Sequence, residues 1–305
     1  DQAVNIYDRL LHLKNATPEI LTAALRGAVL NRSSDQGIPI LVDRLLGDDD
    51  DAFAAALRVS REMDENHAAT TAALAGQLPK ASPARKVRIL DVFGSGDGDI
   101  AGPAALALAN DGDSEVRIAA LRAVTRMNYS PALKVLAQLA LSDDEKLAEV
   151  AKSSLAYFPG TDRNVAIEEM LKSDQATARR VAIALIGQGG LDKPVALLMK
   201  TAETDSDESV RVAALESLRD YAGIDEMPRL LDKMLKAQSP AEMHAAESTL
   251  TALCERQQAM PGGIAIIVDA FCGAFKQAQG DAKLAVLRLL GVAGGPKAFD
   301  VVRAA

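Results

Sequence analysis

Two segments of the chain carry nearly the same sequence. Residues 111–124 read DGDSEVRIAALRAV and residues 205–218 read DSDESVRVAALESL, with an Asp, a Val-Arg pair and an Ala-Ala-Leu run in register. Equivalent apolar residues recur along the chain at intervals of 28 to 37 residues: Leu25, Leu57, Leu90, Leu121, Leu155, Ile183, Leu215, Leu250 and Leu287. Such a period indicates a solenoid, in which each unit covers its apolar face by stacking on its neighbours.

Each repeat divides into two helical halves. In the second half Val116, Ala120 and Val124 follow one another at steps of four, which places them on one face of a helix. The first half is a short apolar run that opens with a proline in four repeats, at Pro39, Pro131, Pro194 and Pro228. Proline is tolerated in the first turn of a helix because the amides there have no helical partner. The sequence therefore predicts an all-α fold, an α-solenoid of about nine antiparallel helix pairs.

The composition favours helices over sheets. Aromatic residues make up only 3% of the chain and tryptophan is absent, whereas 49% of the residues are hydrophobic. Strands favour aromatic and β-branched side chains, while closely packed helices accept small ones. Cys254 and Cys272 each lie in an apolar helical run, so we expect two core residues rather than a disulfide. No apolar run reaches the roughly 18 residues that a membrane span needs.

The repeated motif resembles a known family. Asp111 with Val116-Arg117, and the matching Asp205 with Val210-Arg211, resemble the HEAT repeat, particularly the short bacterial form also found in phycobilin lyase subunits. The resemblance implies a HEAT-like superhelix in which the turn aspartate and the arginine six residues later stack into a ladder.

The ladder has a physical basis in the residues themselves. A carboxylate in the turn can cap the amides that begin the second helix, and a nearby arginine can donate a charge-assisted bond to it. We therefore expect ion pairs between Asp111 and Arg117 and between Asp205 and Arg211. Elsewhere the arginine position holds Arg179, Phe53, Lys86 or Ala151, which predicts an interrupted ladder.

The last residues have the pattern of another repeat. GGPKAFDVVRAA (294–305) looks like the opening helix of a tenth unit, so we expect residues 1–305 to be a single array from a longer polypeptide. Such arrays are similar to the HEAT regions of large multidomain bacterial proteins, many of which are exported. The resemblance implies a periplasmic or extracellular protein, with a cytoplasmic one as the alternative.

Residues that carry chemistry are few and scattered. His12, His67 and His244 lie several repeats apart, too far to share a metal or a catalytic triad in a solenoid. The glycine-rich FGSGDGD (93–99) lacks the Lys-Ser/Thr ending of a phosphate loop and predicts a turn between repeats. The run DDDD (48–51) lacks the ligand spacing of a calcium loop and suits a helix start. We expect no catalytic residue, metal or cofactor.

A charged stripe remains as the candidate site. It lies on the face of each second helix opposite the apolar one, the face that lines the concave side of HEAT solenoids. The predicted partner-binding residues are Arg26, Arg58, Arg88, Arg122 and Arg126 in the first four repeats, and Glu216, Asp220 and Glu255 in the seventh and eighth. The stripe is either a binding groove with a basic and an acidic end or a charged face that only keeps the protein soluble.

Three functions are compatible with these features. The leading hypothesis is a non-catalytic scaffold that binds a protein or peptide or positions attached domains. The second is a lyase or chaperone-like subunit resembling phycobilin lyases, with Glu216, Asp220 and His244 as candidate pocket residues. The third is a nucleic-acid binder, which the net charge of −8 and the scattered Tyr129, Tyr157 and Tyr221 disfavour.

Overall fold

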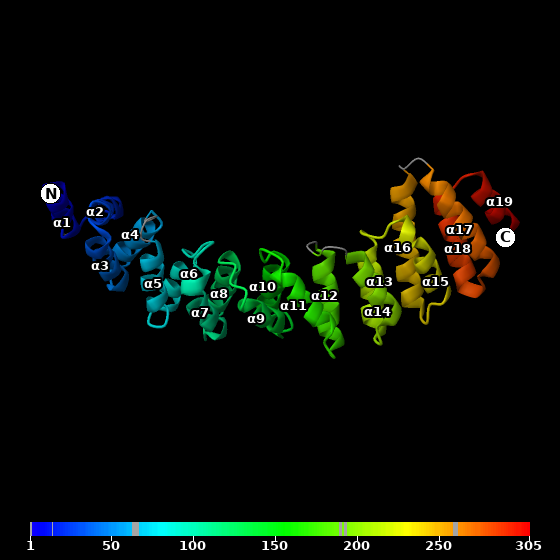
Figure 1. The fold of residues 1–305 in the computed structure, drawn as a ribbon, viewed down its shortest axis with the longest axis horizontal. Coiled ribbons are helices and arrows are strands. Elements are labelled where there is room, and N and C mark those ends of the chain that lie inside the picture. The colour runs from blue at the N-terminus through cyan, green and yellow to red at the C-terminus, as the bar shows by residue number, and fades with distance from the viewer. Residues whose placement is uncertain (1, 14, 63–66, 189–190, 192–193, 259–261) are drawn as a thin grey trace. The chain divides into compact units, whose positions relative to one another are not determined.

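The computed structural model describes residues 2–13, 15–62, 67–188, 191, 194–258 and 262–305. Within these ranges the chain forms nineteen α-helices and no β-strand, which confirms the predicted all-α class. It divides into two compact units, unit 1 (Asp1–Arg163) and unit 2 (Asn164–Ala305). Each unit is a stack of helix hairpins and fits a HEAT-like repeat array (Figure 1). The architecture is an α-solenoid.

The helices of unit 1 follow the predicted repeat. They are α1 (Gln2–Leu11), α2 (Pro18–Leu30), α3 (Ser34–Leu46), α4 (Asp50–Ser60), α5 (His67–Gln77), α6 (Pro83–Leu90), α7 (Gly98–Ala107), α8 (Ser114–Arg126), α9 (Ala132–Leu139) and α10 (Glu145–Ala156). A short 3₁₀ turn, η2 (Leu108–Asn110), extends α7. Odd-numbered helices are the first helices of the repeats and even-numbered helices are the second helices.

The helices of unit 2 continue the same alternation. Helix α11 (Asp162–Leu171) begins in the last residues of unit 1, and the others are α12 (Ala176–Gly187), α13 (Pro194–Thr204), α14 (Glu208–Leu218), η3 (Ile224–Glu226), α15 (Met227–Leu235), α16 (Pro240–Gln258), α17 (Gly263–Gln277), α18 (Gly280–Ala293) and α19 (Pro296–Ala304). Helix α19 packs on α17 and α18.

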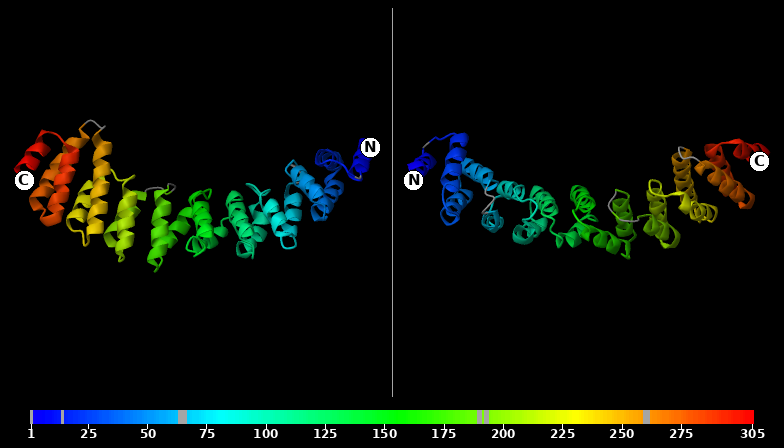
Figure 2. Two further views of the ribbon diagram at one scale, coloured as in Figure 1. Left: turned by 180° about the vertical axis from the view of Figure 1, so that it is seen from behind. Right: turned by 45° about the horizontal axis from the view of Figure 1, so that its top comes forward.

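Each unit has two layers of helices. Second helices pack on the next second helix, α6 on α8 and α8 on α10 in unit 1, and α12 on α14 and α14 on α16 in unit 2. First helices form the other layer, with α3 next to α5 and α15 next to α17. In the left view of Figure 2 the successive helix pairs of unit 2 follow one another in chain order. In each of these repeats, the face of the second helix that points away from the first helices is therefore left for solvent or a ligand.

The core lies between the two layers. The recurring apolar residues are its centre, because all but one of the nine are buried and Leu287 is half-buried. Small residues let the helices approach closely. Gly102 of α7, for example, lies under the ring of Tyr129, where a β-carbon would come within 2.5 Å of the ring atoms. Tyr129 is thus a packing residue.

Prolines mark most of the predicted helix starts. Pro194 and Pro228 are the first and second residues of α13 and α15, and Pro131 directly precedes α9. Pro39 is different, because α3 begins at Ser34 and contains the proline in its interior. The prediction that Pro39 opens its helix is therefore wrong by one turn and a half. The polar stretch before Pro39 supplies that turn.

Candidate interaction surface

Aspartates cap the second helices. Asp113 accepts hydrogen bonds from the backbone N–H groups of Glu115 (2.8 Å) and Val116 (3.2 Å), and Asp207 caps α14 in the same way. Asp49, from the DDDD run, accepts from the amides of residues 51 and 52. Each carboxylate satisfies amides that have no helical partner and meets the positive end of the helix dipole. The predicted role of the DDDD run at a helix start is confirmed.

The repeats of α8 and α14, called the twin repeats because their motifs are nearly identical, have a second aspartate two residues before the cap. Asp111 Oδ1 accepts the backbone N–H of Asp113 at 2.9 Å, and Asp205 Oδ1 accepts that of Asp207 at 2.9 Å. These bonds hold one oxygen of each turn carboxylate against its own turn. The other oxygen is left for a partner outside the turn.

The arginine four residues after the cap reaches back over the turn. Arg117 Nη1 donates to the backbone oxygen of Asp111 at 3.0 Å, and Arg211 Nη1 donates to that of Asp205 at 2.8 Å. Arg179 makes the same bond to Ser173, also at 2.8 Å. The bond satisfies a carbonyl in the turn and fixes the direction of the guanidinium. What remains of the guanidinium is turned toward the next repeat.

The ion pairs connect neighbouring repeats. Arg179 Nε and Nη2 donate to the two carboxylate oxygens of Asp205, both at 2.8 Å, and Lys86 Nζ lies 2.7 Å from Asp111 Oδ2. Arg117 Nη2 lies 3.3 Å from Asp144 of the following repeat. The predicted pairs within a repeat, Asp111 with Arg117 and Asp205 with Arg211, are therefore wrong. Each arginine uses only the backbone oxygen of its own turn aspartate, while the carboxylate binds the preceding repeat.

The pair formed by Arg211 is the most buried of this ladder. Its Nε donates to Glu242 Oε1 at 2.7 Å, and Lys233 Nζ lies 3.0 Å from Glu242 Oε2. The Glu242 side chain is fully buried, whereas the Asp144 side chain that binds Arg117 is 38% exposed. Two cations therefore compensate one carboxylate in the core of unit 2.

These contacts change the acidity of the carboxyl groups. The hydrogen bond from Lys86 lowers the pKa of Asp111. Burial acts to raise the pKa of Asp205, but the bonds from Arg179 and from the Asp207 amide outweigh it and the pKa is lowered. Burial likewise opposes ionisation of Glu242, and the bonds from Lys233 and Arg211 bring its pKa below the usual value. All three groups are held as carboxylates.

In the second repeat an aromatic ring takes the place of the arginine. Phe53 stands four residues after its cap, and its buried ring lies under the guanidinium groups of Arg85 (4.7 Å) and Arg88 (4.9 Å) of the next repeat. A cation–π contact thus replaces the ion pair. Arg85 Nη1 also donates to the backbone oxygen of Gly47 at 2.6 Å.

A second set of donors binds the ends of the second helices. Arg126 Nη2 donates to the backbone oxygen of Leu90 at 2.8 Å, at the end of α6. In unit 2, the Tyr221 hydroxyl donates to the backbone oxygen of Gly187 at 3.0 Å, and Arg256 donates to that of Arg219, the residue that follows α14. These donors satisfy carbonyls that have no partner at a helix C-terminus. Arg126 and Tyr221 are thereby fixed to structural contacts.

The predicted stripe divides into engaged and unengaged side chains. Arg26 pairs with Glu62, Arg88 stacks on Phe53, and Arg126 holds the end of α6. The others are exposed and form no hydrogen bond or ion pair with the described residues: Arg58, Arg122, Glu216, Asp220 and Glu255. Within the described ranges the stripe thus has unpaired arginines in unit 1 and unpaired acids in unit 2.

An open groove of about 600 Å³ runs over the outward face of α14. Its lining residues are Arg180 of α12, Asp207, Glu208, Ser209, Val212, Ala213 and Glu216 of the α14 repeat, and Ala241 of α16. Sequence reasoning found Glu216 but missed the rest of the groove. Glu208 and Val212 precede Glu216 by eight and four residues, which puts all three on one face of the helix.

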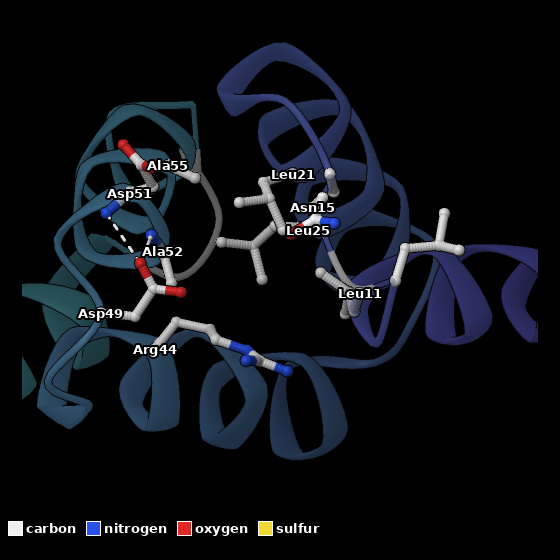
Figure 3. A pocket seen from close by; sticks show the side chains of 11 residues that line it. Leu11, Asn15, Leu21, Leu25, Arg44, Asp49, Asp51, Ala52 and Ala55 are labelled. Carbon is white, nitrogen blue, oxygen red and sulfur yellow. Dashed lines mark hydrogen bonds between the residues drawn. The ribbon is translucent and has the colours of Figure 1, made fainter.

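A smaller cavity of about 240 Å³ lies in unit 1. Figure 3 shows Leu21 and Leu25 of α2 directed toward α4, with Arg44 of α3 below them and Asp49 at the start of α4. The Nε atom of Arg44 is buried and has no hydrogen-bond partner. Leucine and alanine side chains line the cavity together with polar ones, among which Asp49 and Asp51 bring two carboxylates.

The residues able to carry chemistry do not converge. His12 and His244 are exposed, and the side chain of His67 lies outside the described part of the chain. Both cysteines are buried and free, as predicted, and burial raises the pKa of Cys254 to about 11. Among the described residues no group of His, Cys, Asp and Glu is suited to a metal ion. No helix in the described ranges has the length and apolar character to cross a bilayer.

The glycine-rich loop is a structured turn. Asp97 is buried, its Oδ2 accepts the backbone N–H of Gly94 at 2.8 Å, and its Oδ1 accepts the Thr71 hydroxyl at 2.8 Å. The loop's central acceptor is thus used internally. The predicted turn between repeats is confirmed.

No protein-family model matches the chain, and no curated protein matches it. Among solved structures the chain is similar to an engineered protein from a structural genomics consortium, with 17% identity and a TM-score of 0.41 over 99% of this chain and 92% of that one. It is also similar to the complex of CpcE and CpcF of phycocyanin lyase from Nostoc sp. PCC7120, with 17% identity and a TM-score of 0.32 over 78% of this chain and 94% of that one. At these identities the matches do not extend to site residues.

Proposed function

We propose that the chain is a non-catalytic interaction scaffold that binds a protein or peptide segment on the outward faces of its second helices. The observation that carries the proposal is a division of work among the charged side chains. Those next to the turns join neighbouring repeats, as Arg179 and Asp205 do. Those on the outward faces, such as Arg122 and Glu216, are exposed and have no ion pair in the part of the chain that the structure describes. Unpaired charges on a face held rigid by a ladder favour recognition of a partner.

The alternatives receive less support from the same residues. A lyase-like subunit needs a pocket that encloses its substrate, but Glu216 lies in an open groove and His244 is exposed. A nucleic-acid surface needs free aromatic rings for stacking. Tyr129 packs on Gly102 and Tyr221 binds carbonyls at the end of α12, so of the three tyrosines only Tyr157 is exposed, and one isolated ring does not form a stacking surface.

Hydrogen exchange tests the proposal. The purified chain is incubated with an extract of its native source, recovered with any retained partner, and compared with the free chain by hydrogen-exchange mass spectrometry. We expect slower exchange in second helices, including α8 or α14, and unchanged exchange in first helices such as α9 and α15. Retention of no partner, or protection confined to first helices, would contradict the proposal.

The matched variant avoids the structural arginines. Arg58→Glu with Arg122→Glu reverses two exposed side chains that have no ion pair with the described residues, and it leaves Arg126 on its carbonyls. We expect it to weaken retention of a partner held by unit 1 without changing the fold, because exposed charges contribute little to stability.

A further inference from the structure

We infer that the groove over α14 binds a cationic segment of a partner protein, a stretch in which lysine or arginine side chains alternate with apolar ones. The inference rests on the proposed function and adds the chemistry of the partner at one place. Three features of the groove support it: an uncovered apolar floor, a surplus of unpaired carboxylates and a size suited to a peptide segment.

The apolar floor of the groove is partly open, whereas the equivalent residues of α8 are covered. Val212 and Ala213 of α14 are half-buried and line the groove. Ile118 and Ala119 occupy the same positions of α8 and are only 2% and 5% exposed. The same motif therefore covers its apolar pair in unit 1 and leaves it open in unit 2. Burying that pair under a partner's apolar side chain would be favourable.

The walls of the groove select a cation. Three carboxylates line it, from Asp207, Glu208 and Glu216, against the single guanidinium of Arg180. Glu208 and Glu216 form no ion pair with the described residues, and neither does Arg180. The bond from the Ser209 hydroxyl lowers the pKa of Asp207, which keeps that group ionised. A cationic side chain between Glu208 and Glu216 would be attracted by both carboxylates.

The size and openness of the groove favour a peptide over a small molecule. Its volume of about 600 Å³ is that of a typical ligand pocket, but its rim residues Arg180, Glu208 and Ala241 are exposed. It therefore takes several side chains of a segment that lies across α14. An anionic segment or a phosphate backbone would face three carboxylates and is disfavoured.

A synthetic peptide tests the inference on the full chain. The probe is a fluorescent twelve-residue peptide of lysine, leucine and alanine, and its partner control carries glutamate in place of lysine. Binding is followed by fluorescence anisotropy, and its location by hydrogen exchange. We expect binding of the lysine peptide only, weaker at higher salt, with protection of α14 and the start of α16.

Paired charge reversals separate the groove from the general acidity of the chain. Glu208→Lys with Glu216→Lys should weaken binding of the lysine peptide by about tenfold or more. Glu149→Lys with Glu168→Lys reverses two exposed acids outside the groove that form no ion pair with any described residue, and it gives the same change of net charge. That control should leave the affinity within about twofold.

The outcomes distinguish this inference from the broader proposal. Equal loss in both double variants, or protection outside α14 and α16, would overturn the inference. So would a self-association of the chain, seen by sedimentation, that the Glu208→Lys and Glu216→Lys variant abolishes, because a second copy would then be the occupant. If the native partner still protects second helices while the lysine peptide does not bind, the scaffold proposal stands and the cationic segment is wrong.

Discussion

The twin repeats built on α8 and α14 share a motif but differ in what surrounds it. Both begin with an aspartate cap, and both place an arginine over the backbone oxygen of the turn, Arg117 on Asp111 and Arg211 on Asp205. Beyond the turn they diverge. The guanidinium of Arg117 meets the half-exposed carboxylate of Asp144, whereas that of Arg211 meets a fully buried carboxylate, Glu242.

The difference extends to the outward faces. The position of Arg122 in α8 is that of Glu216 in α14, so the charge is reversed at equivalent places. The position of Arg126 is that of Asp220, and only Arg126 binds helix-end carbonyls. The motif therefore fixes the local turn, while the neighbouring repeat decides whether each side chain contributes stability or faces solvent.

The largest expected effect is on the buried pair. Arg211→Ala should lower the free energy of unfolding by about 3 kcal/mol, because it removes one of the two cations that compensate the buried Glu242. Arg117→Ala should cost only about 1 kcal/mol, because Asp144 is partly solvated. Urea denaturation followed by circular dichroism measures both, with Arg122→Ala as the control expected near zero. Equal losses for Arg211 and Arg117 would remove the distinction between the twins.

Acid should weaken unit 2 through the same carboxylates. The pKa values of Asp205 and Glu242 are lowered in the folded state, so their contribution is complete above the unfolded pKa of about 4 and is lost as the pH falls through the folded values. Asp205→Asn should cost about 1–2 kcal/mol at pH 7 and flatten the pH dependence of stability below about pH 4. Urea midpoints between pH 7 and pH 2 check this. An unchanged slope in the variant would be inconsistent with a native ion pair at Asp205.

Helix-end contacts provide a smaller difference. Arg126→Ala should cost about 1–2 kcal/mol because carbonyls at the end of α6 lose their donor, whereas the equivalent Asp220→Ala should stay within about 0.5 kcal/mol. In unit 2 the Tyr221 hydroxyl donates to a carbonyl at the end of α12, so Tyr221→Phe should lower the free energy of unfolding by about 1 kcal/mol. Amide exchange at the ends of α6 and α12 reports the losses locally. A costly Asp220→Ala would show an unrecognised contact of that side chain.

The smallest effect on stability is expected from exchanging the outward charges. Arg122→Glu and Glu216→Arg should each change the free energy of unfolding by less than about 0.5 kcal/mol, since neither side chain has a partner among the described residues. Melting curves of the two single variants and the double variant are sufficient. A loss above about 1 kcal/mol would mean that the stripe contributes to the fold rather than to recognition.

The helix pairs and the core were predictable from the sequence because the same spacing of apolar residues recurs in each repeat. The register was less secure, as the repeat of α10 shows. Leu155 follows the cap at Asp144 by eleven residues, whereas Leu121 follows Asp113 by eight. In this repeat the residue four positions after the cap is Ala148 and not Ala151. Ala148 therefore occupies the position that holds an arginine in the repeats of α8 and α14. Apolar residues one helical turn apart satisfy the same pattern, and only the cap fixes the register.

The partners of the ladder residues and the groove over α14 could not be predicted from the sequence. The sequence spacing of Asp205 and Arg211 is compatible with an ion pair within one repeat. In the structure Oδ1 of Asp205 accepts the backbone N–H of Asp207, and this bond directs the carboxylate toward Arg179 of the preceding repeat. Glu242 was not predicted at all, because its buried position depends on the contacts of α16 with α14 and α15. The open floor at Val212 likewise depends on neighbours, since nearly the same residues are covered in α8.

The most direct test of the account is a pair of double-mutant cycles that share Asp205. One cycle combines Asp205→Ala with Arg179→Ala, and the other combines it with Arg211→Ala, each measured by urea denaturation. The structure predicts a coupling energy of about 1–3 kcal/mol with Arg179, whose bidentate pair is nearly buried, and less than about 0.5 kcal/mol with Arg211, which binds only the backbone oxygen of Asp205. A strong coupling with Arg211 and none with Arg179 would contradict a ladder that joins neighbouring repeats.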